Sequence, residues 1–200
     1  MADTTDAPNK AELILEAAQE LFTQLGFRRT SMDDVARRAG VAKGTLYLYF
    51  DNKAAVFRAM QQRNFDRADE RCDAAEAKGR SFEARLAGVL AAYYGWMHEH
   101  YGASEHLAEL GQTRVLVGRD LAEDHDRRYS ARLAGLIRRG TDEGELTLDR
   151  VGMDEAQVAA AILDAARGAK AEASKPVTPA QYNAALKRIA RVISAGLVRG

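Results

Sequence analysis

The sequence has little of what ties a chain to an oxidising or membrane setting. It contains one cysteine, Cys72, which cannot form an internal disulfide, so a reducing compartment is expected. A core position is the favoured role for this thiol, ahead of a redox sensor. Only three prolines occur in 200 residues, and alanine, leucine, arginine and glutamate recur, which favours helix. The formal net charge is zero, so any surface for nucleic acid must be a local patch.

Long apolar runs are also missing. The longest, residues 89–97, includes a glycine and falls far short of the ~20 residues of a membrane-spanning helix. The first ten residues, MADTTDAPNK, are polar and lack the apolar core of a signal peptide. We therefore expect a cytoplasmic protein whose residues 1–9 form a disordered N-terminal segment.

Apolar residues recur with helical spacing along the chain, and no alternating strand pattern persists. Ser31 with Asp34 resembles a capping box, Ser104 is a candidate cap, and Thr178 followed by Pro179 marks a helix start. About nine helices are predicted, over residues 10–25, 31–38, 43–50, 52–78, 82–101, 104–117, 121–139, 154–173 and 178–198. The predicted fold class is all-α, with a small domain at residues 10–56 and a larger helical domain at residues 57–200.

Residues 32–50 have the layout of a helix-turn-helix, in which Gly40 permits the tight turn between two short helices. Gly44 lies inside the second helix, where glycine costs ~0.5–1 kcal/mol relative to alanine. Close approach of this helix to a phosphate or a base edge would offset that cost. Seven basic and three acidic residues give the segment 26–58 a net charge of +4, which fits a DNA-binding patch. A structural helical hairpin with a solvated basic face explains the periodicity equally well.

The second short helix combines a cation with dense aromatic residues. Lys43 adds a full charge where a helix start already favours phosphate. Thr45 can hydrogen-bond to a base or a phosphate, and Tyr47 can donate its hydroxyl to a phosphate. Tyr49 and Phe50 are expected chiefly to anchor the helix to the core of the small domain.

Taken in order, these residues resemble the TetR family of bacterial transcriptional repressors. The family pattern is I..AA..LF...G[FY], then T[ST]...[IV]A..AG[VI], then KGTLY.YF..K. It is matched by Ile14, Ala17, Ala18, Leu21, Phe22, Gly26, Phe27, Thr30, Ser31, Val35, Ala36, Ala39, Gly40, Val41, Lys43, Gly44, Thr45, Leu46, Tyr47, Tyr49, Phe50 and Lys53. The match covers about residues 10–58. Many members have Ser or Thr where this chain has Ala42. A polar residue is frequent at the position of Leu48, which suggests that Leu48 either packs against the protein or contacts a base methyl group.

The resemblance implies an N-terminal three-helix DNA-binding domain and a C-terminal domain for ligand binding and dimerisation. Residues of the second short helix would lie at the DNA, and residues at the starts of the neighbouring helices would contact the DNA backbone. The implied DNA-binding residues are Arg28, Arg29, Thr30, Ser31, Lys43, Gly44, Thr45, Leu46, Tyr47, Tyr49 and Lys53.

An aromatic stripe on the helix predicted at residues 82–101 is the best candidate for a ligand pocket. Helical spacing places Tyr93, Trp96, Met97 and His100 on one side and His98 on the other. A plain core stripe is the simpler interpretation, but these side chains also suit a pocket wall with a few polar groups. The resemblance implies a small-molecule effector in this region. The candidate ligand-binding residues are Phe65, Tyr93, Trp96, Met97, His100 and Arg114.

The last two predicted helices carry small residues and an apolar stripe, which either complete the subunit core or form an interface. In the TetR family such helices usually form a four-helix interface between two copies. A two-fold dimer would place two reading helices on a palindrome. The candidate dimer-interface residues are Ala161, Ala165, Gly168, Ala169, Tyr182, Leu186, Ile189, Ile193 and Leu197.

The function predicted from these patterns is a ligand-responsive repressor that binds palindromic operator DNA as a homodimer. The long fourth helix would carry the effector signal to the DNA-binding residues. An all-helical enzyme is the second hypothesis, but the sequence offers no nucleophile elbow, phosphate loop or convincing acid–base pair. No pair of histidines has the i, i+4 spacing of a helical chelate, so no metal and no cofactor is expected. A helical scaffold or carrier without a DNA role is the third hypothesis.

Overall fold

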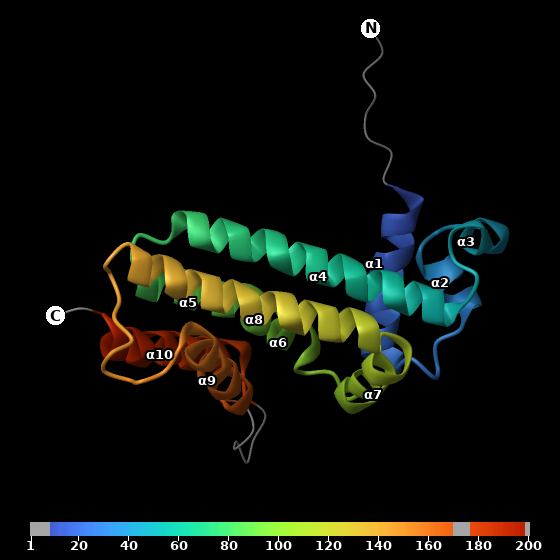
Figure 1. Ribbon diagram of the computed structural model, residues 1–200. Helices are drawn as coiled ribbons and strands as arrows, with labels where there is room; N and C mark the ends of the chain where they lie inside the picture. The colour runs from blue at the N-terminus through green and yellow to red at the C-terminus, as the bar shows by residue number, and fades with distance from the viewer. Residues whose placement is uncertain (1–8, 170–176, 199–200) are drawn as a thin grey trace, which may run out of the picture. The chain divides into compact units, whose positions relative to one another are not determined.

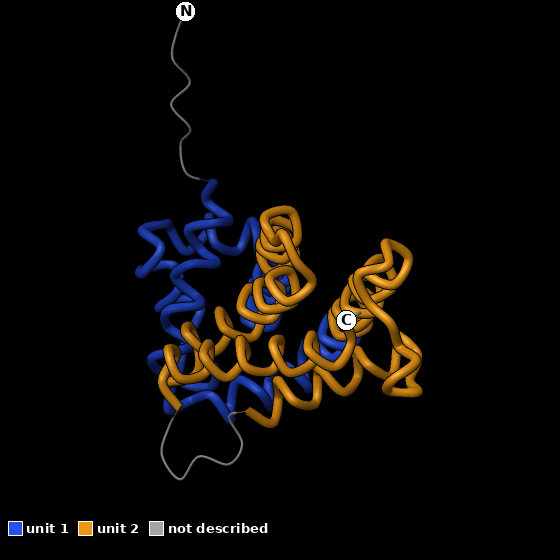
Figure 2. The backbone as a smooth tube through the Cα atoms, turned by 90° about the vertical axis from the view of Figure 1, so that its left-hand side faces the viewer, with its two compact units in different colours: residues 1–65, 104–123 blue, residues 66–103, 124–200 orange. Residues whose placement is uncertain are grey.

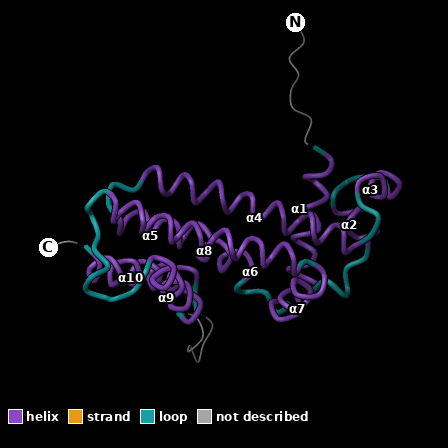
Figure 3. Tube along the Cα trace, viewed as in Figure 1, coloured by secondary structure: helices purple, strands orange, loops and turns teal. Residues whose placement is uncertain are grey.

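The computed structural model describes residues 9–169 and 177–198, and these residues fold into helices (Figures 1 and 3). Apart from an isolated bridge between Leu146 and Val198, the described residues contain no β-structure. None of their helices combines the length and apolar character needed to cross a membrane. The elements are α1 (Lys10–Leu25), α2 (Met32–Arg38), α3 (Lys43–Tyr49), α4 (Lys53–Lys78), α5 (Phe82–Leu90), η1 (Ala91–Gly95), α6 (Trp96–Tyr101), α7 (Leu107–Val117), α8 (Arg119–Asp142), α9 (Glu155–Gly168) and α10 (Pro179–Leu197).

These elements confirm the all-α prediction, with nine helical runs in the described residues when α5, η1 and α6 are counted as one. Side-chain caps set several of the boundaries. Ser31 and Asp34 form the predicted capping box at α2, and Thr178 caps α10 with Pro179 in its first turn. The predicted segment 1–9 lies outside the described residues except for Asn9, whose side chain caps α1.

The predicted helix over residues 82–101 is interrupted by the π-helical segment η1. A π-helical turn inserts an extra residue, which rotates everything after it by about 100°. Consequently His98 is buried and His100 is exposed, the reverse of the prediction from regular α-helical spacing. The side of the helix assigned to these two residues was therefore wrong.

The chain divides into two compact units (Figure 2). Unit 1 comprises residues 1–65 and 104–123, and thus contains α1, α2, α3, α7 and the first half of α4. Its core includes a cluster of three phenylalanines, in which the ring of Phe22 lies 5.3 Å from that of Phe27 and 5.8 Å from that of Phe57. This cluster ties α4 to α1 and to the loop after it. The predicted domain boundary at residue 56 stays a prediction.

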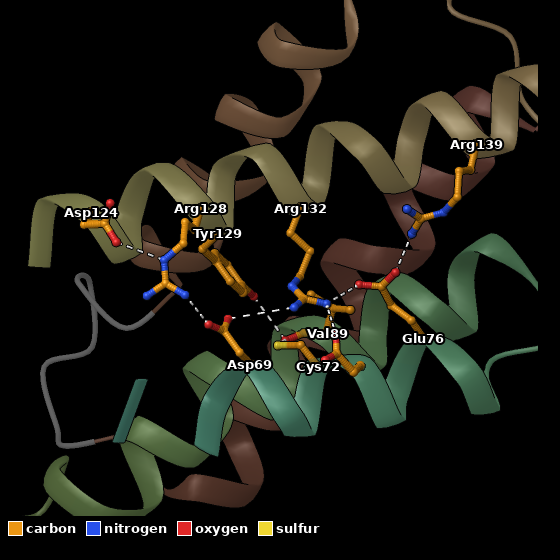
Figure 4. Close-up of polar contacts among 10 residues, drawn as sticks. Asp69, Cys72, Glu76, Val89, Asp124, Arg128, Tyr129, Arg132 and Arg139 are labelled. Carbon is orange, nitrogen blue, oxygen red and sulfur yellow. Dashed lines mark hydrogen bonds and ion pairs between the residues drawn. The ribbon is translucent and has the colours of Figure 1, made fainter. Parts of the chain in front are cut away.

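Unit 2 comprises residues 66–103 and 124–200, with its core between α5, α8, α9 and α10. Within this unit, ion pairs join the end of α4 to α8 (Figure 4). Arg128 bridges Asp124 of its own helix and Asp69 of α4, and Arg132 lies 2.7 Å from both Asp73 and Glu76. Because Arg132 is largely shielded from solvent, its pairs are screened less than exposed ones.

Candidate nucleic-acid interface

The first helix of the predicted helix-turn-helix begins at a well-formed cap. Ser31 Oγ accepts a hydrogen bond from the Asp34 backbone N–H, and the Asp34 carboxylate accepts one from the Ser31 backbone N–H. Hydrogen bonds from Ser31 lower the pKa of Asp34, and Arg37 lowers it further. The cap therefore fixes the start of α2 and holds a negative charge there, which interacts favourably with the positive end of the helix dipole.

The turn between α2 and α3 depends on Gly40, whose φ of 67° is one that L-residues rarely adopt. The Val41 backbone N–H donates to the Ala36 carbonyl across this turn at 3.0 Å. Ala42 occupies the N-cap of α3 and gives it no side-chain hydrogen bond. The Ala42 departure therefore leaves α3 without the capping that Ser or Thr would provide.

Helix α3 has one buried anchor and one open face. Leu46 is completely buried, which locks α3 against the rest of unit 1. Gly44 and Leu48, two positions to either side of Leu46, lie on the opposite face. A Cβ added at Gly44 would meet no atom within 4 Å, and Leu48 is 85% exposed. Unit 1 therefore exposes to solvent a low ridge made of a glycine and, one turn later, a leucine.

Aromatic and basic groups surround this ridge. Tyr47 and Tyr49 are both exposed, so the expectation that Tyr49 anchors α3 in the core was wrong. Lys43 Nζ lies 2.8 Å from Asp33, whose hydrogen bond raises the pKa of Lys43. Both side chains of this pair are more than half exposed, so the pair holds little free energy and a phosphate can replace the carboxylate.

Four of the other predicted contacts, Arg28, Arg29, Ser31 and Thr45, remain at least partly accessible. Two are not. Leu46 and Thr30 are buried, and Thr30 Oγ1 donates to the Gly26 carbonyl at 2.8 Å. We correct both assignments: these side chains hold the scaffold and face no ligand, because the apolar core and the end of α1 enclose them.

Lys53 also differs from the prediction. Its ammonium donates to the carbonyls of Phe27, Arg28 and Thr30, at 2.7, 3.2 and 2.6 Å, and lies over the Phe27 ring. Burial lowers the pKa of this lysine. Its hydrogen bonds therefore join the start of α4 to the loop before α2, which positions the surface around Arg28 and Arg29.

The predicted ligand-binding residues fall in different units. Phe65 and Arg114 belong to unit 1, where the guanidinium lies over the phenyl ring at 5.7 Å. Unit 2 holds the other four predicted residues, Tyr93, Trp96, Met97 and His100. Tyr93 is buried beside His125, 4.7 Å between ring centroids, and beside Tyr129 at 4.8 Å. His100 is exposed and stacks on Trp96 instead, so it does not belong to this cluster.

The predicted dimer residues also separate into two groups. On α9, Ala161, Ala165 and Gly168 are exposed, and Ala169, which caps the end of this helix, is half-buried. On α10, Ile189 and Ile193 are half-buried. Tyr182, Leu186 and Leu197 are buried within their own subunit, where the Tyr182 hydroxyl donates to the Ala166 carbonyl. We therefore remove these three from the candidate interface, because the apolar stripe of α10 that carries them packs inside unit 2.

Two exposed apolar residues stand outside the lists of predicted site residues, although packing or contact with a base methyl group was expected of Leu48. Leu48 follows Gly44 by one helical turn and lies opposite Leu46, a spacing that the sequence alone displays. Val192 of α10 is 71% exposed, beside the half-buried Ile189. The signal that finds both is a position two residues from a buried one, Leu46 for Leu48 and Ala190 for Val192, rather than apolar character alone.

Comparison with known proteins agrees with this geometry. Residues 14–60 match the family described as bacterial regulatory proteins, tetR family. The uncharacterized HTH-type transcriptional regulator YhgD of Bacillus subtilis (strain 168) is 51% identical over 49 residues, 24% of this chain and 26% of that relative. The chain thus spans about a quarter of that relative's length.

Two longer matches extend beyond the N-terminal segment. The fatty acid metabolism regulator protein of Bacillus subtilis (strain 168) is 26% identical over 134 residues, covering 66% of this chain and 69% of the relative. The solved structure of the fatty acid degradation regulator FadR from Bacillus halodurans aligns with a TM-score of 0.66 at 20% identity. That alignment covers 94% of this chain and 96% of the other, and it shows a common fold.

Proposed function

The chain belongs to the tetR family of bacterial regulatory proteins, a family of DNA-binding transcriptional regulators rather than enzymes, and from this premise we propose that it is a homodimeric repressor. It binds a palindromic operator and leaves it when a small-molecule effector binds. Because its operator is bacterial DNA, the protein works in the cytoplasm.

The open face of α3 is the observation that supports DNA binding by these particular residues. Gly44, Tyr47 and Leu48 face solvent on a helix that Leu46 anchors. Lys43, Arg28 and Arg29 add exposed positive charge nearby in the sequence, and the segment 26–58 is +4. Such a face fits the major groove, where a few side chains contact bases and cations contact phosphates.

Two copies are needed because α3 has only seven residues and contacts few base pairs. A two-fold pair of such helices covers two half-sites about one turn of DNA apart, or a multiple of it. The exposed Ala161, Ala165 and Gly168 of α9 support a close helix–helix interface, and the exposed Val192 of α10 supplies apolar area.

Effector binding is assigned to unit 2, around the buried Tyr93 and its neighbours Tyr129 and His125. The residues of α4 and α8 are divided between both units, so these helices are the segments through which an effector changes DNA affinity. A relative named as a fatty acid metabolism regulator makes fatty acids the first class of effector to test.

Selection of bound fragments from random duplex DNA tests the DNA-binding role. We expect enrichment of a palindrome and a dissociation constant that rises steeply with salt concentration. If no sequence is enriched at low ionic strength and the protein remains monomeric, the proposed function is wrong.

Titration of the protein–operator complex with fatty acids of increasing chain length tests whether an effector releases the protein from DNA. Transcription of a reporter gene from the operator, measured with and without the effector, tests whether the bound protein represses.

A further inference from the structure

The open face of α3 ends in a side chain that the general DNA-binding role does not explain. Leu48 is the most exposed of the large apolar residues in the described part of the chain. A single exposed leucine is common on protein surfaces. This one lies between two exposed tyrosines, one turn after a bare glycine, on the face opposite the buried Leu46.

The shape of this face would let Leu48 reach the floor of the major groove of DNA. Nothing in unit 1 lies within 4 Å of the position of a Gly44 Cβ, so the first turn of α3 presents bare backbone. With that turn free to approach a base pair closely, the next projecting group on the same face is the Leu48 side chain. Tyr47 and Tyr49, on either side of Leu48, are exposed and carry hydroxyls that can donate to phosphates.

The chemistry of a leucine restricts what it can face there. An isobutyl group neither donates nor accepts hydrogen bonds, so a polar base edge beneath it loses water without gaining a partner. In the major groove the base edges present nitrogen and oxygen atoms, together with one methyl group, at C5 of thymine. Contact with that methyl removes more apolar surface from water, on both sides, than contact with any other group of the base edges.

We propose that Leu48 is a specificity-determining residue that recognises the C5-methyl group of a thymine in each operator half-site. This inference rests on the proposed function and adds the base that α3 selects. Hydrogen bonding to a neighbouring base is left to Thr45, and Tyr47 contacts a phosphate. The operator therefore carries a thymine at one fixed position of each half-site.

Substitution of deoxyuridine for thymine tests this directly, because it removes only the methyl group. Each thymine of a selected operator is replaced in turn, in one half-site and then symmetrically in both, and the dissociation constant is measured by fluorescence anisotropy. At one position the wild-type protein loses about fourfold in affinity per half-site, the effect of one buried methyl-sized group. Leu48→Ala binds the thymine operator more weakly and shows no loss at that position.

A matched control separates this effect from general loss of apolar surface. Leu116 of α7 is 80% exposed in the same unit, and Leu116→Ala is expected to keep the wild-type response to deoxyuridine. Equal deoxyuridine penalties in wild type and Leu48→Ala, or no penalty at any thymine, overturn the inference while leaving operator binding intact. A protein that selects no operator at all overturns the proposed function and this inference together.

Discussion

A substitution at Gly44 is expected to change the stability of the protein and its affinity for DNA in opposite directions. A methyl group at this position meets no atom of the protein, and alanine is a better helix former than glycine. Gly44→Ala is therefore expected to raise the free energy of unfolding by about 0.5–1 kcal/mol. If the backbone of α3 lies against DNA, the same methyl group weakens operator binding at least tenfold. Urea denaturation and operator titration measure the two effects, and a variant with unchanged affinity would show that Gly44 does not approach the duplex.

Lys43 is held by Asp33 in the free protein, at 2.8 Å. If its ammonium leaves Asp33 for a phosphate, Lys43→Ala reduces the slope of log affinity against log salt by about one. Asp33→Asn is expected to raise operator affinity, because it removes the carboxylate that competes with the phosphate for Lys43. Lys187→Ala, on an exposed face of α10, is the control and leaves the slope unchanged. An unchanged slope in Lys43→Ala would exclude the phosphate contact.

Cys72 is predicted to be chemically silent while the protein is folded. It is completely buried, and burial raises the pKa of its thiol from 9.0 to about 12. Since the folded pKa exceeds the unfolded one, the thiol favours folding below pH 9, and this contribution is lost as the pH rises toward 12. Iodoacetamide at pH 8 should modify Cys72 rapidly in urea and very slowly without it. Rapid modification of the native protein would show that the site opens, and the pH dependence is checked against Cys72→Ala.

For the helices, the caps were the most reliable signals in the sequence. Ser31 and Thr178 each accept a hydrogen bond from a backbone N–H in the first turn of the helix they precede. These bonds form between residues three apart, so the local sequence contains everything they need. Ser104 is not the N-cap of α7, which begins only at Leu107 after His106. Its hydroxyl accepts a hydrogen bond from the His106 backbone N–H, ahead of the helix, and donates one to the Thr23 carbonyl.

The π-helical segment η1 shows what local patterns could not supply. Both Tyr93 and Tyr94 are buried side by side, their rings 5.0 Å apart, where a regular α-helix turns adjacent residues 100° from each other. Packing against α8 and α10 favours burying both, and the inserted residue then brings His98 inward, where it contacts Tyr182. The stabilisation that comes from burying both tyrosines depends on helices far along the chain, so the local sequence around residues 91–95 does not predict the π-helical segment.

Helix α10 offers a test of capping. Thr178 accepts a hydrogen bond from the Gln181 backbone N–H, and the Gln181 side chain accepts one from the Thr178 backbone N–H. Thr178→Ala is expected to lower the free energy of unfolding by about 1 kcal/mol, whereas Thr178→Ser costs much less. Chemical denaturation of both variants measures the difference. Equal losses in the two would show that the methyl group of Thr178, and not its hydroxyl, stabilises α10.

For the chain as a whole, the grouping of distant segments was the least predictable feature. Residues 104–123 form a compact unit with the N-terminal helices, although they lie far along the chain from them. Side chains explain this grouping: the Arg28 backbone N–H donates to Glu109 at 2.6 Å, and Arg58 pairs with Asp120 at 2.7 Å. Each such contact links residues about 60 to 80 positions apart, which helical periodicity does not detect.

Assembly of two copies gives the last prediction. Ala165 lies on the exposed small-residue face of α9, so a glutamate there folds without a clash but places like charges across a two-fold interface. Ala165→Glu is therefore expected to sediment as a monomer, with unchanged helicity by circular dichroism and at least a hundredfold weaker operator binding. Ala160→Glu, at an exposed alanine farther round the same helix, should remain dimeric. A dimeric Ala165→Glu variant with wild-type affinity would show that the interface does not include α9. A monomeric variant that still binds the operator fully would show that one seven-residue α3 is enough for binding, without a second copy.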